Sequence, residues 1–170
     1  MEQIFKIKKD FVAPFIAIVA LLCLLLILSL FTGQRWEKII LAVLFAGALP
    51  VAIEAAKREI TVTENGLKIK KFFRTKDITW PEITHLGVVN LNKKAYFLLT
   101  TTKGFYFFSN MYENHPLLIS SIMNKLDVEK VEVEVKNYLE HPVERRSLIF
   151  VCWITVLIII AFIVLKLLPA

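Results

Sequence analysis

The stretch FVAPFIAIVALLCLLLILSLF, residues 11–31, contains no charged side chain. An α-helix of this length measures about 31 Å, which matches the ~30 Å hydrocarbon core of a bilayer. The stretch is longer than the roughly 7–15 apolar residues of a signal peptide, and no small-x-small cleavage motif follows it. We therefore expect a retained membrane-spanning helix.

Two further stretches have the same character. Residues 39–56 (IILAVLFAGALPVAIEAA) carry a single charge, Glu54, near their end, and residues 148–168 carry only Lys166. Because residues 32–38 form a short connector, the first two stretches are predicted to make an antiparallel hairpin. The chain has 170 residues, is 56% hydrophobic and has a positive mean hydropathy. These values fit three spans and one small domain.

Lys and Arg residues near the ends of the three spans are distributed unequally. Seven lie on one side of the membrane: Lys6, Lys8, Lys9, Lys57, Arg58, Arg145 and Arg146. Three lie on the other side: Arg35, Lys38 and Lys166. The positive-inside rule therefore predicts a multi-pass protein of the cytoplasmic (inner) membrane, with the N-terminus and residues 57–147 cytoplasmic and the C-terminus external.

Residues 57–147 are the only long stretch polar enough to fold in water, and apolar and polar residues alternate along its first half. The alternation predicts an antiparallel meander of strands at residues 60–63, 67–70, 77–80, 83–89, 95–101 and 105–109. Glu64-Asn65-Gly66 predicts a tight hairpin turn, because Asn and Gly both accept a positive φ. Residues 74–76 are read as a second turn, and Trp80 as a core aromatic at a strand end.

A helix is predicted to follow the strands, with Asn114 as its N-cap and Pro116 in its first turn. Residues 127–147 are acidic and have helical periodicity, although the alternation at residues 131–135 also fits a strand. The expected organisation is a cytoplasmic N-terminus (1–10), a transmembrane hairpin (11–56, spans 11–31 and 39–56), a β-domain with a closing helix (57–126), an acidic helical spacer (127–147) and a third transmembrane helix (148–168).

Residues 60–67 (ITVTENGL) and 78–83 (ITWPEI), preceded by a membrane hairpin and followed by a helix at 117–126, resemble the bacterial pleckstrin-homology (PH)-like domain membrane proteins. The resemblance covers residues 58–126. It implies an α+β domain, in which a bent antiparallel sheet of about six to seven strands forms a partly open β-barrel with a C-terminal helix at one end. It implies no catalytic residues. The third span departs from the hairpin-plus-domain pattern of this family.

The sequence contains no recognisable catalytic or phosphate-binding motif. There is no Gly-rich phosphate loop, Cys pair or nucleophile elbow, and the histidines are isolated from one another. Cys23 and Cys152 lie within apolar stretches, where they are read as small hydrophobic residues. We therefore expect no enzyme activity, no cofactor and no metal site. A membrane enzyme stays an alternative that would need polar groups converging from distant positions.

Basic residues concentrate on one predicted hairpin. Next to a bilayer, such a cluster meets anionic lipid before nucleic acid, so no nucleic-acid partner is expected. The candidates for non-specific contact with the anionic inner leaflet are Lys68, Lys70, Lys71, Phe72, Phe73, Arg74 and Lys76. Packing inside the domain is the alternative for the two Phe residues.

Two ionisable residues lie within the predicted spans. Glu54 is the candidate intramembrane polar residue. Its nearness to Lys57 favours a boundary position, with transport or proton relay as the alternative. Lys166 lies near the other end of the third span and is expected to extend its ammonium outward to the headgroups.

Residues 96–99 and 105–108 are apolar on both faces of their predicted strands, so one face must meet a helix, a partner or the membrane. This predicts a non-catalytic, membrane-anchored PH-like module for protein assembly or scaffolding at the inner leaflet, with docking on anionic lipid as a further possibility. The expected protein partner is a second copy or another membrane protein. The alternative is an immunity or accessory subunit that acts on another membrane protein through its transmembrane helices.

Overall fold

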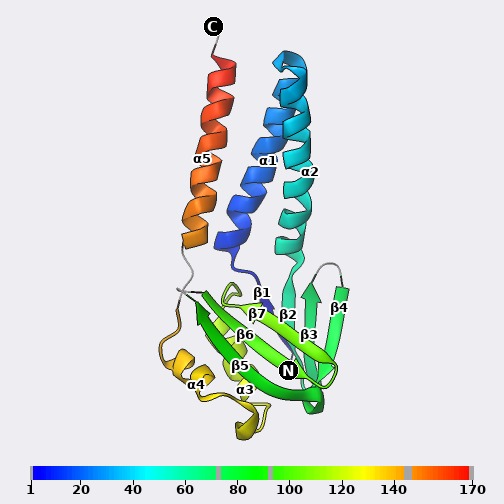
Figure 1. Cartoon of the computed structure of the whole chain (residues 1–170), viewed down its shortest axis with the longest axis vertical. Coiled ribbons are helices and arrows are strands. Elements are labelled where there is room, and N and C mark those ends of the chain that lie inside the picture. The colour runs from blue at the N-terminus through cyan, green and yellow to red at the C-terminus, as the bar shows by residue number, and fades with distance from the viewer. Residues whose placement is uncertain (1, 72–73, 92–93, 144–146, 169–170) are drawn as a thin grey trace. The chain divides into compact units, whose positions relative to one another are not determined.

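The computed structural model describes residues 2–71, 74–91, 94–143 and 147–168. The chain divides into two compact units (Figure 1). The first comprises Met1–Lys8 and Lys57–Arg145, and the second comprises Lys9–Ala56 and Arg146–Ala170.

The second unit is built from three long helices, α1 (Lys9–Thr32), α2 (Arg35–Lys57) and α5 (Ser147–Leu167). Within the described part of the chain, these three are long and apolar enough to cross a membrane. The three predicted spans are therefore confirmed as helices of suitable length and composition. Each begins or ends within a few residues of its predicted bounds, because polar residues at the ends continue the helical hydrogen bonding.

Leu side chains of the hairpin pack against Ile side chains of α5 in this unit. The buried cluster consists of Leu22 and Leu25 from α1, Leu41 from α2, and Ile159 and Ile163 from α5. Most of the remaining apolar surface of the helices is exposed. In a bilayer this surface would contact lipid, which is why its exposure carries no penalty there.

The first unit contains two small antiparallel sheets in the described ranges, neither of them closed into a barrel. One sheet has the strand order β1-β2-β3-β4, with strands Gln3–Lys6, Glu59–Val62, Gly66–Lys71 and Arg74–Thr79. The other has the order β5-β6-β7, with strands Ile83–Leu91, Lys94–Thr101 and Gly104–Ser109. The short 3-10 helix η1 (Trp80–Glu82) separates the two sheets along the chain, where a single bent sheet was predicted.

All six predicted strands are present, and a seventh, β1, lies in the segment expected to be a free N-terminus, residues 1–10. Phe5 of β1 pairs with Ile60 of β2 and is buried. Four residues carry too short a pattern to predict a strand by themselves. Pairing with a strand more than fifty positions away along the chain forms β1, so residues 3–6 belong to the first unit, which we name the soluble unit.

The β2–β3 hairpin does not use the turn that was predicted for Asn65 and Gly66. Among the described residues, a positive φ occurs at Gly104 and Asn114, not at these two positions. Instead, the amide of Thr63 donates to Gly66 O at 2.9 Å, and the hydroxyl of Thr63 accepts from the Gly66 amide at 3.1 Å. Gly66 is required for space, since a Cβ there would lie 2.1 Å from the carbonyl oxygen of Ile78.

The next hairpin also differs from its prediction. Lys71 of β3 pairs directly with Arg74 of β4, so residues 74–76, which were predicted to form the turn, lie in a strand. The two residues between the paired positions, Phe72 and Phe73, lie outside the described residues.

Three short helical segments complete the first unit: α3 (His115–Met123), η2 (Val128–Lys130) and α4 (Val133–Glu140). The predicted N-cap position of α3, Asn114, is confirmed, with a left-handed backbone at φ 48°. The buried side chains of α3 are His115, Leu118, Ile119 and Ile122.

Residues 127–147 were expected to form a spacer, and the described part of this segment instead packs on the sheet. Val131 forms a parallel bridge with Leu86 of β5, and Val135 and Tyr138 of α4 are buried. The ring of Tyr138 meets Phe97 of β6 edge to face, with centroids 5.1 Å apart. The segment is strand-like at Val131 and helical from Val133, so each of the two alternatives holds for one part of it.

Candidate functional site

One side of the β5-β6-β7 sheet is open and apolar. Along β6, Ala95, Phe97, Leu99 and Thr101 are buried, while the alternate residues are partly exposed. The pairing register places Leu98 beside Phe107 and Val89 beside Tyr96 on this open side. We call this surface the apolar sheet face; it consists of Val89, Leu91, Tyr96, Leu98, Phe105 and Phe107.

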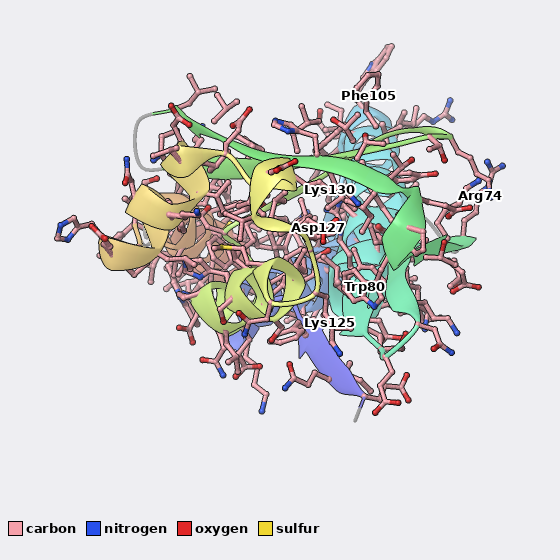
Figure 2. All side chains as sticks on the ribbon, turned by 90° about the horizontal axis from the view of Figure 1, so that it is seen from below. Arg74, Trp80, Phe105, Lys125, Asp127 and Lys130 are labelled. Atoms are coloured by element: carbon pink, nitrogen blue, oxygen red, sulfur yellow. The ribbon has the colours of Figure 1, made fainter. Side chains whose placement is uncertain are left out.

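Two phenylalanines of β7 are the most exposed aromatic side chains of this face. Phe105 is 70% exposed and Phe107 is 60% exposed. Figure 2 shows Phe105 projecting away from the ribbon. Removing apolar surface from water is favourable by roughly 25 cal/mol per Å². A contiguous exposed patch of this kind is typical of a docking surface.

A carboxylate lies on the open side of this sheet: that of Glu132, which lies over Gly87 and pairs with His85. By the alternating register, the polar strand residues on this side are His85, Lys94, Thr100 and Ser109. The face therefore combines aromatic and aliphatic side chains with a positive margin at Lys94, while Glu132 is paired with His85 at β5. A complementary surface would be apolar at its centre and acidic at its rim.

Lys71 extends this positive margin from the other sheet of the same unit. Its Nζ lies 4.7 Å from the centroid of the Phe107 ring, which is a cation–π distance. The pair joins the predicted basic hairpin to the apolar sheet face. The sequence did not predict this contact, because the two residues lie on different strands of different sheets.

The remaining basic candidates differ in whether an acidic side chain lies close to them. Lys70 Nζ lies 3.1 Å from Glu59 Oε1, and Lys68 Nζ lies 3.7 Å from Asp77 Oδ1. Arg74 and Lys76 are exposed, and Figure 2 shows Arg74 extending outward. The cluster that the sequence predicted as one lipid-facing group is thus partly neutralised by acidic residues on neighbouring strands.

Glu132 is hydrogen-bonded to β5, an edge strand of this sheet, through both its backbone and its side chain. Its amide donates to Leu86 O at 3.0 Å, and its Oε2 accepts from the Val88 amide at 3.3 Å. Its Oε1 lies 2.7 Å from His85 Nε2. His85 therefore has a carboxylate neighbour, which the sequence did not reveal because the two residues are far apart along the chain.

A corner around Trp80 connects the two sheets. The indole Nε1 donates to Glu64 O at 2.9 Å, so Trp80 is half-buried against the β2–β3 loop instead of lying in the core as predicted. Glu82 accepts hydrogen bonds from the Thr79 amide at 3.1 Å and from Lys103 Nζ. The hydrogen bond from Lys103 is the main reason why the pKa of Glu82 lies below its ordinary value, and Glu82 in turn raises the pKa of Lys103.

The second unit, which we name the membrane-spanning unit for its three helices of spanning length, contains two carboxylates of interest. Glu54, predicted as the intramembrane polar residue, is half-buried near the C-terminal end of α2. Glu37 was predicted to lie in the connector between the first two spans. It lies instead in the first turn of α2 and accepts a hydrogen bond from Lys166 of α5. Lys166 was expected to extend its ammonium outward to the lipid headgroups. This prediction is corrected by the structure, in which Lys166 pairs with Glu37 within the unit.

No group of three or more His, Cys, Asp or Glu side chains is close enough to hold a metal ion within the described ranges. Comparison with protein-family models, with curated proteins and with solved structures finds no match for this chain.

Proposed function

We propose that this chain is a non-catalytic, membrane-anchored module that binds another protein through the apolar sheet face of a PH-like soluble unit. The observation that carries the proposal is the joint exposure of Phe105 and Phe107 on the apolar sheet face. Aromatic side chains in such a position are typical of interface centres.

The order of elements supports the PH-like part of this proposal. A four-stranded and a three-stranded antiparallel sheet are followed by α3, as the resemblance of residues 58–126 implies. The three apolar helices support the membrane anchor. A cytoplasmic position of the soluble unit follows from the positive-inside rule applied to the span ends.

The charges favour a different protein over a second copy as the partner. In a two-fold symmetric dimer the same patch lies on both sides of the interface. Lys71 and Lys94 of one copy would then approach the same basic margin of the other, and like charges across an interface are unfavourable. We therefore propose a membrane-protein partner whose contact surface is apolar with an acidic rim.

A photocrosslinking experiment in native membranes tests the proposal. The full chain carries p-benzoylphenylalanine at Phe107 or, as a matched control, at Leu117 of α3, which is exposed elsewhere on the soluble unit. We expect a protein adduct of defined mass at position 107 and none at 117. No protein adduct at 107, or equal adducts at both positions, would contradict the proposal.

Docking on anionic lipid is the second candidate, because Arg74 and Lys76 are exposed on the same β3–β4 hairpin as Lys71. It is less favoured because Lys68 and Lys70 pair with acidic residues. The same crosslinking chain in nanodiscs distinguishes the two candidates. A lipid adduct at position 107 that forms with anionic but not with neutral lipid would support lipid docking.

A role carried by the spans alone, as in an immunity or accessory subunit, makes a separate prediction. A chain lacking residues 57–143 would retain the biological activity in that case. In our proposal the same deletion abolishes partner binding.

A further inference from the structure

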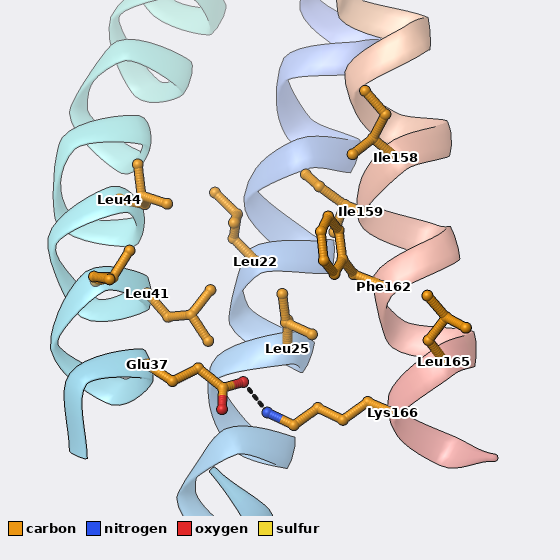
Figure 3. A pocket seen from close by; sticks show the side chains of 11 residues that line it. Leu22, Leu25, Glu37, Leu41, Leu44, Ile158, Ile159, Phe162, Leu165 and Lys166 are labelled. Carbon is orange, nitrogen blue, oxygen red and sulfur yellow. Dashed lines mark hydrogen bonds and ion pairs between the residues drawn. The ribbon is translucent and has the colours of Figure 1, made fainter. Parts of the chain in front are cut away.

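A groove of about 770 Å³ lies between the helices of the membrane-spanning unit (Figure 3). Leu41 and Leu44 of α2 line one side, Ile158 and Phe162 of α5 line the other, and Leu25 of α1 lines the floor. These side chains are all apolar. The groove has the volume of a ligand pocket, which is about 300–1,000 Å³ in proteins.

One end of the groove is charged. Glu37 and Lys166 both line it, and Lys166 Nζ donates a hydrogen bond to Glu37 Oε1. Glu37 is in the first turn of α2 and Lys166 is in the last turn of α5, so the pair lies at one end of two spanning helices. The apolar wall then continues for seven residues from Glu37 to Leu44, or about 10 Å along α2.

The groove has a charged end followed by an apolar wall. A lipid in a bilayer has the same arrangement, with a polar headgroup followed by acyl chains. The end of a spanning helix lies at the level of the lipid headgroups, and the following turns lie at the level of the acyl chains. A helix of another protein would instead cover the ion pair with apolar side chains, which adds a desolvation cost for both charges. The groove therefore fits a lipid better than a transmembrane segment.

We propose that this groove binds one glycerophospholipid whose headgroup contains both a phosphate and a primary ammonium, as in phosphatidylethanolamine. The phosphate is recognised by the ammonium of Lys166, and the lipid ammonium by the carboxylate of Glu37. One acyl chain lies along Leu41, Leu44 and Phe162. This site is in the spanning unit and does not depend on the function proposed for the apolar sheet face.

The headgroup chemistry makes the preference specific. A phosphatidylglycerol headgroup offers a phosphate to Lys166 but no cation to Glu37, so the net negative charge of this lipid lies uncompensated near that carboxylate. A phosphatidylcholine headgroup has a cation without N–H donors, so it cannot hydrogen-bond to Glu37. We expect phosphatidylethanolamine to bind about tenfold more tightly than either, the factor that one additional charge-assisted hydrogen bond provides.

Native mass spectrometry of the detergent-solubilised full chain measures this preference. The three phospholipids, with identical acyl chains, are titrated separately and the fraction of lipid-bound protein is recorded. The double variant Glu37→Gln/Lys166→Gln removes both charges without leaving one unpaired, and we expect it to bind the three lipids equally. Elution of this variant at the wild-type position in size-exclusion chromatography shows that it is folded.

A pair of tryptophan variants tests the groove itself. Leu44 lines the groove, whereas its neighbour Val43 does not, and both are exposed on α2. Leu44→Trp should reduce phosphatidylethanolamine binding at least about tenfold by filling the space, and Val43→Trp should leave it unchanged.

Three results would overturn the proposal. The first is equal binding of the three lipids by the wild-type chain, and the second is a preference that survives in the double variant. The third is a lipid-free dimer that Leu44→Trp dissociates, because the groove would then hold a helix of a second copy.

Discussion

The ammonium of Lys71 lies over the ring of Phe107, with Nζ 4.7 Å from the ring centroid. The two residues come from β3 and β7, which belong to different sheets of the soluble unit. An exposed cation–π pair contributes only about 0.5–1 kcal/mol to stability. The main consequence of this pair is therefore the position of the positive charge of Lys71. It places a cation at the margin of the most exposed aromatic side chains of the apolar sheet face.

This placement predicts a charge effect on partner binding. Lys71→Glu should strongly reduce the protein adduct formed by a crosslinker at Phe105, because it introduces an acidic group opposite the acidic rim proposed for the partner. Lys136→Glu, an exposed charge reversal on α4, is the matched control and should leave the adduct unchanged. Adduct yields are compared by mass spectrometry. Unchanged yield in Lys71→Glu would argue against the basic margin as a recognition element.

Strand β1 makes the N-terminus part of the soluble unit, so its buried side chain should matter for stability. Phe5→Ala should lower the free energy of unfolding of this unit by about 3–5 kcal/mol, because it leaves a cavity beside Ile60. Ile4→Ala on the same strand is the control, since Ile4 is 57% exposed. Urea unfolding is followed by fluorescence of Trp80 in a chain with Trp36 and Trp153 changed to Phe. Equal midpoints for the two variants would show that β1 does not stabilise the unit.

Substitutions of Gly66 distinguish two reasons for a glycine in the β2–β3 hairpin. One is a positive φ, and the other is lack of space beside the carbonyl of Ile78. If the residue needed a positive φ, Gly66→Asn would be tolerated, because Asn adopts that conformation readily. The close carbonyl of Ile78 predicts instead that Gly66→Asn and Gly66→Ala both destabilise the soluble unit, by about 1–3 kcal/mol. The same Trp80 unfolding assay measures this. Wild-type stability of the Asn variant would restore the turn explanation.

The Glu82–Lys103 pair predicts a direction for pH dependence. The pKa of Glu82 is lowered in the folded chain, so its contribution is present above the unfolded pKa of a Glu side chain and is lost as the pH falls through the folded pKa. The pKa of Lys103 is raised, so its contribution is lost only at strongly alkaline pH. Glu82→Gln should therefore flatten the acid side of the plot of urea midpoint against pH. An acid side as steep as that of the wild type would exclude this pair as its cause.

Topology is predicted from the unequal distribution of Lys and Arg at the span ends. A reporter inserted at Thr102, in the exposed β6–β7 turn, should behave as cytoplasmic, and one fused after residue 168 should behave as external. Paired alkaline phosphatase and green fluorescent protein fusions measure both positions. Phosphatase activity at Thr102 would reverse the orientation.

Local patterns in the sequence determined much of the architecture. Three apolar stretches predicted three helices of spanning length, because a bilayer requires a minimum run of apolar residues. Alternation with period two predicted six strands, and Asn114 with Pro116 predicted the start of α3, because these signals depend only on near neighbours. Residues 96–99 and 105–108, apolar on both strand faces, also indicated a sheet face that the soluble unit does not cover.

Tertiary structure alone decided the contacts between distant parts of the chain, including those of the two candidate sites. Phe5 with Ile60, Lys71 with Phe107, His85 with Glu132 and Glu37 with Lys166 are all pairs joined across long stretches of chain. The sequence carries no local mark of these pairs, because each depends on how strands or helices pair in space. The role of Gly66 was decided in the same way: its backbone is ordinary, and the carbonyl of a neighbouring strand excludes any side chain there.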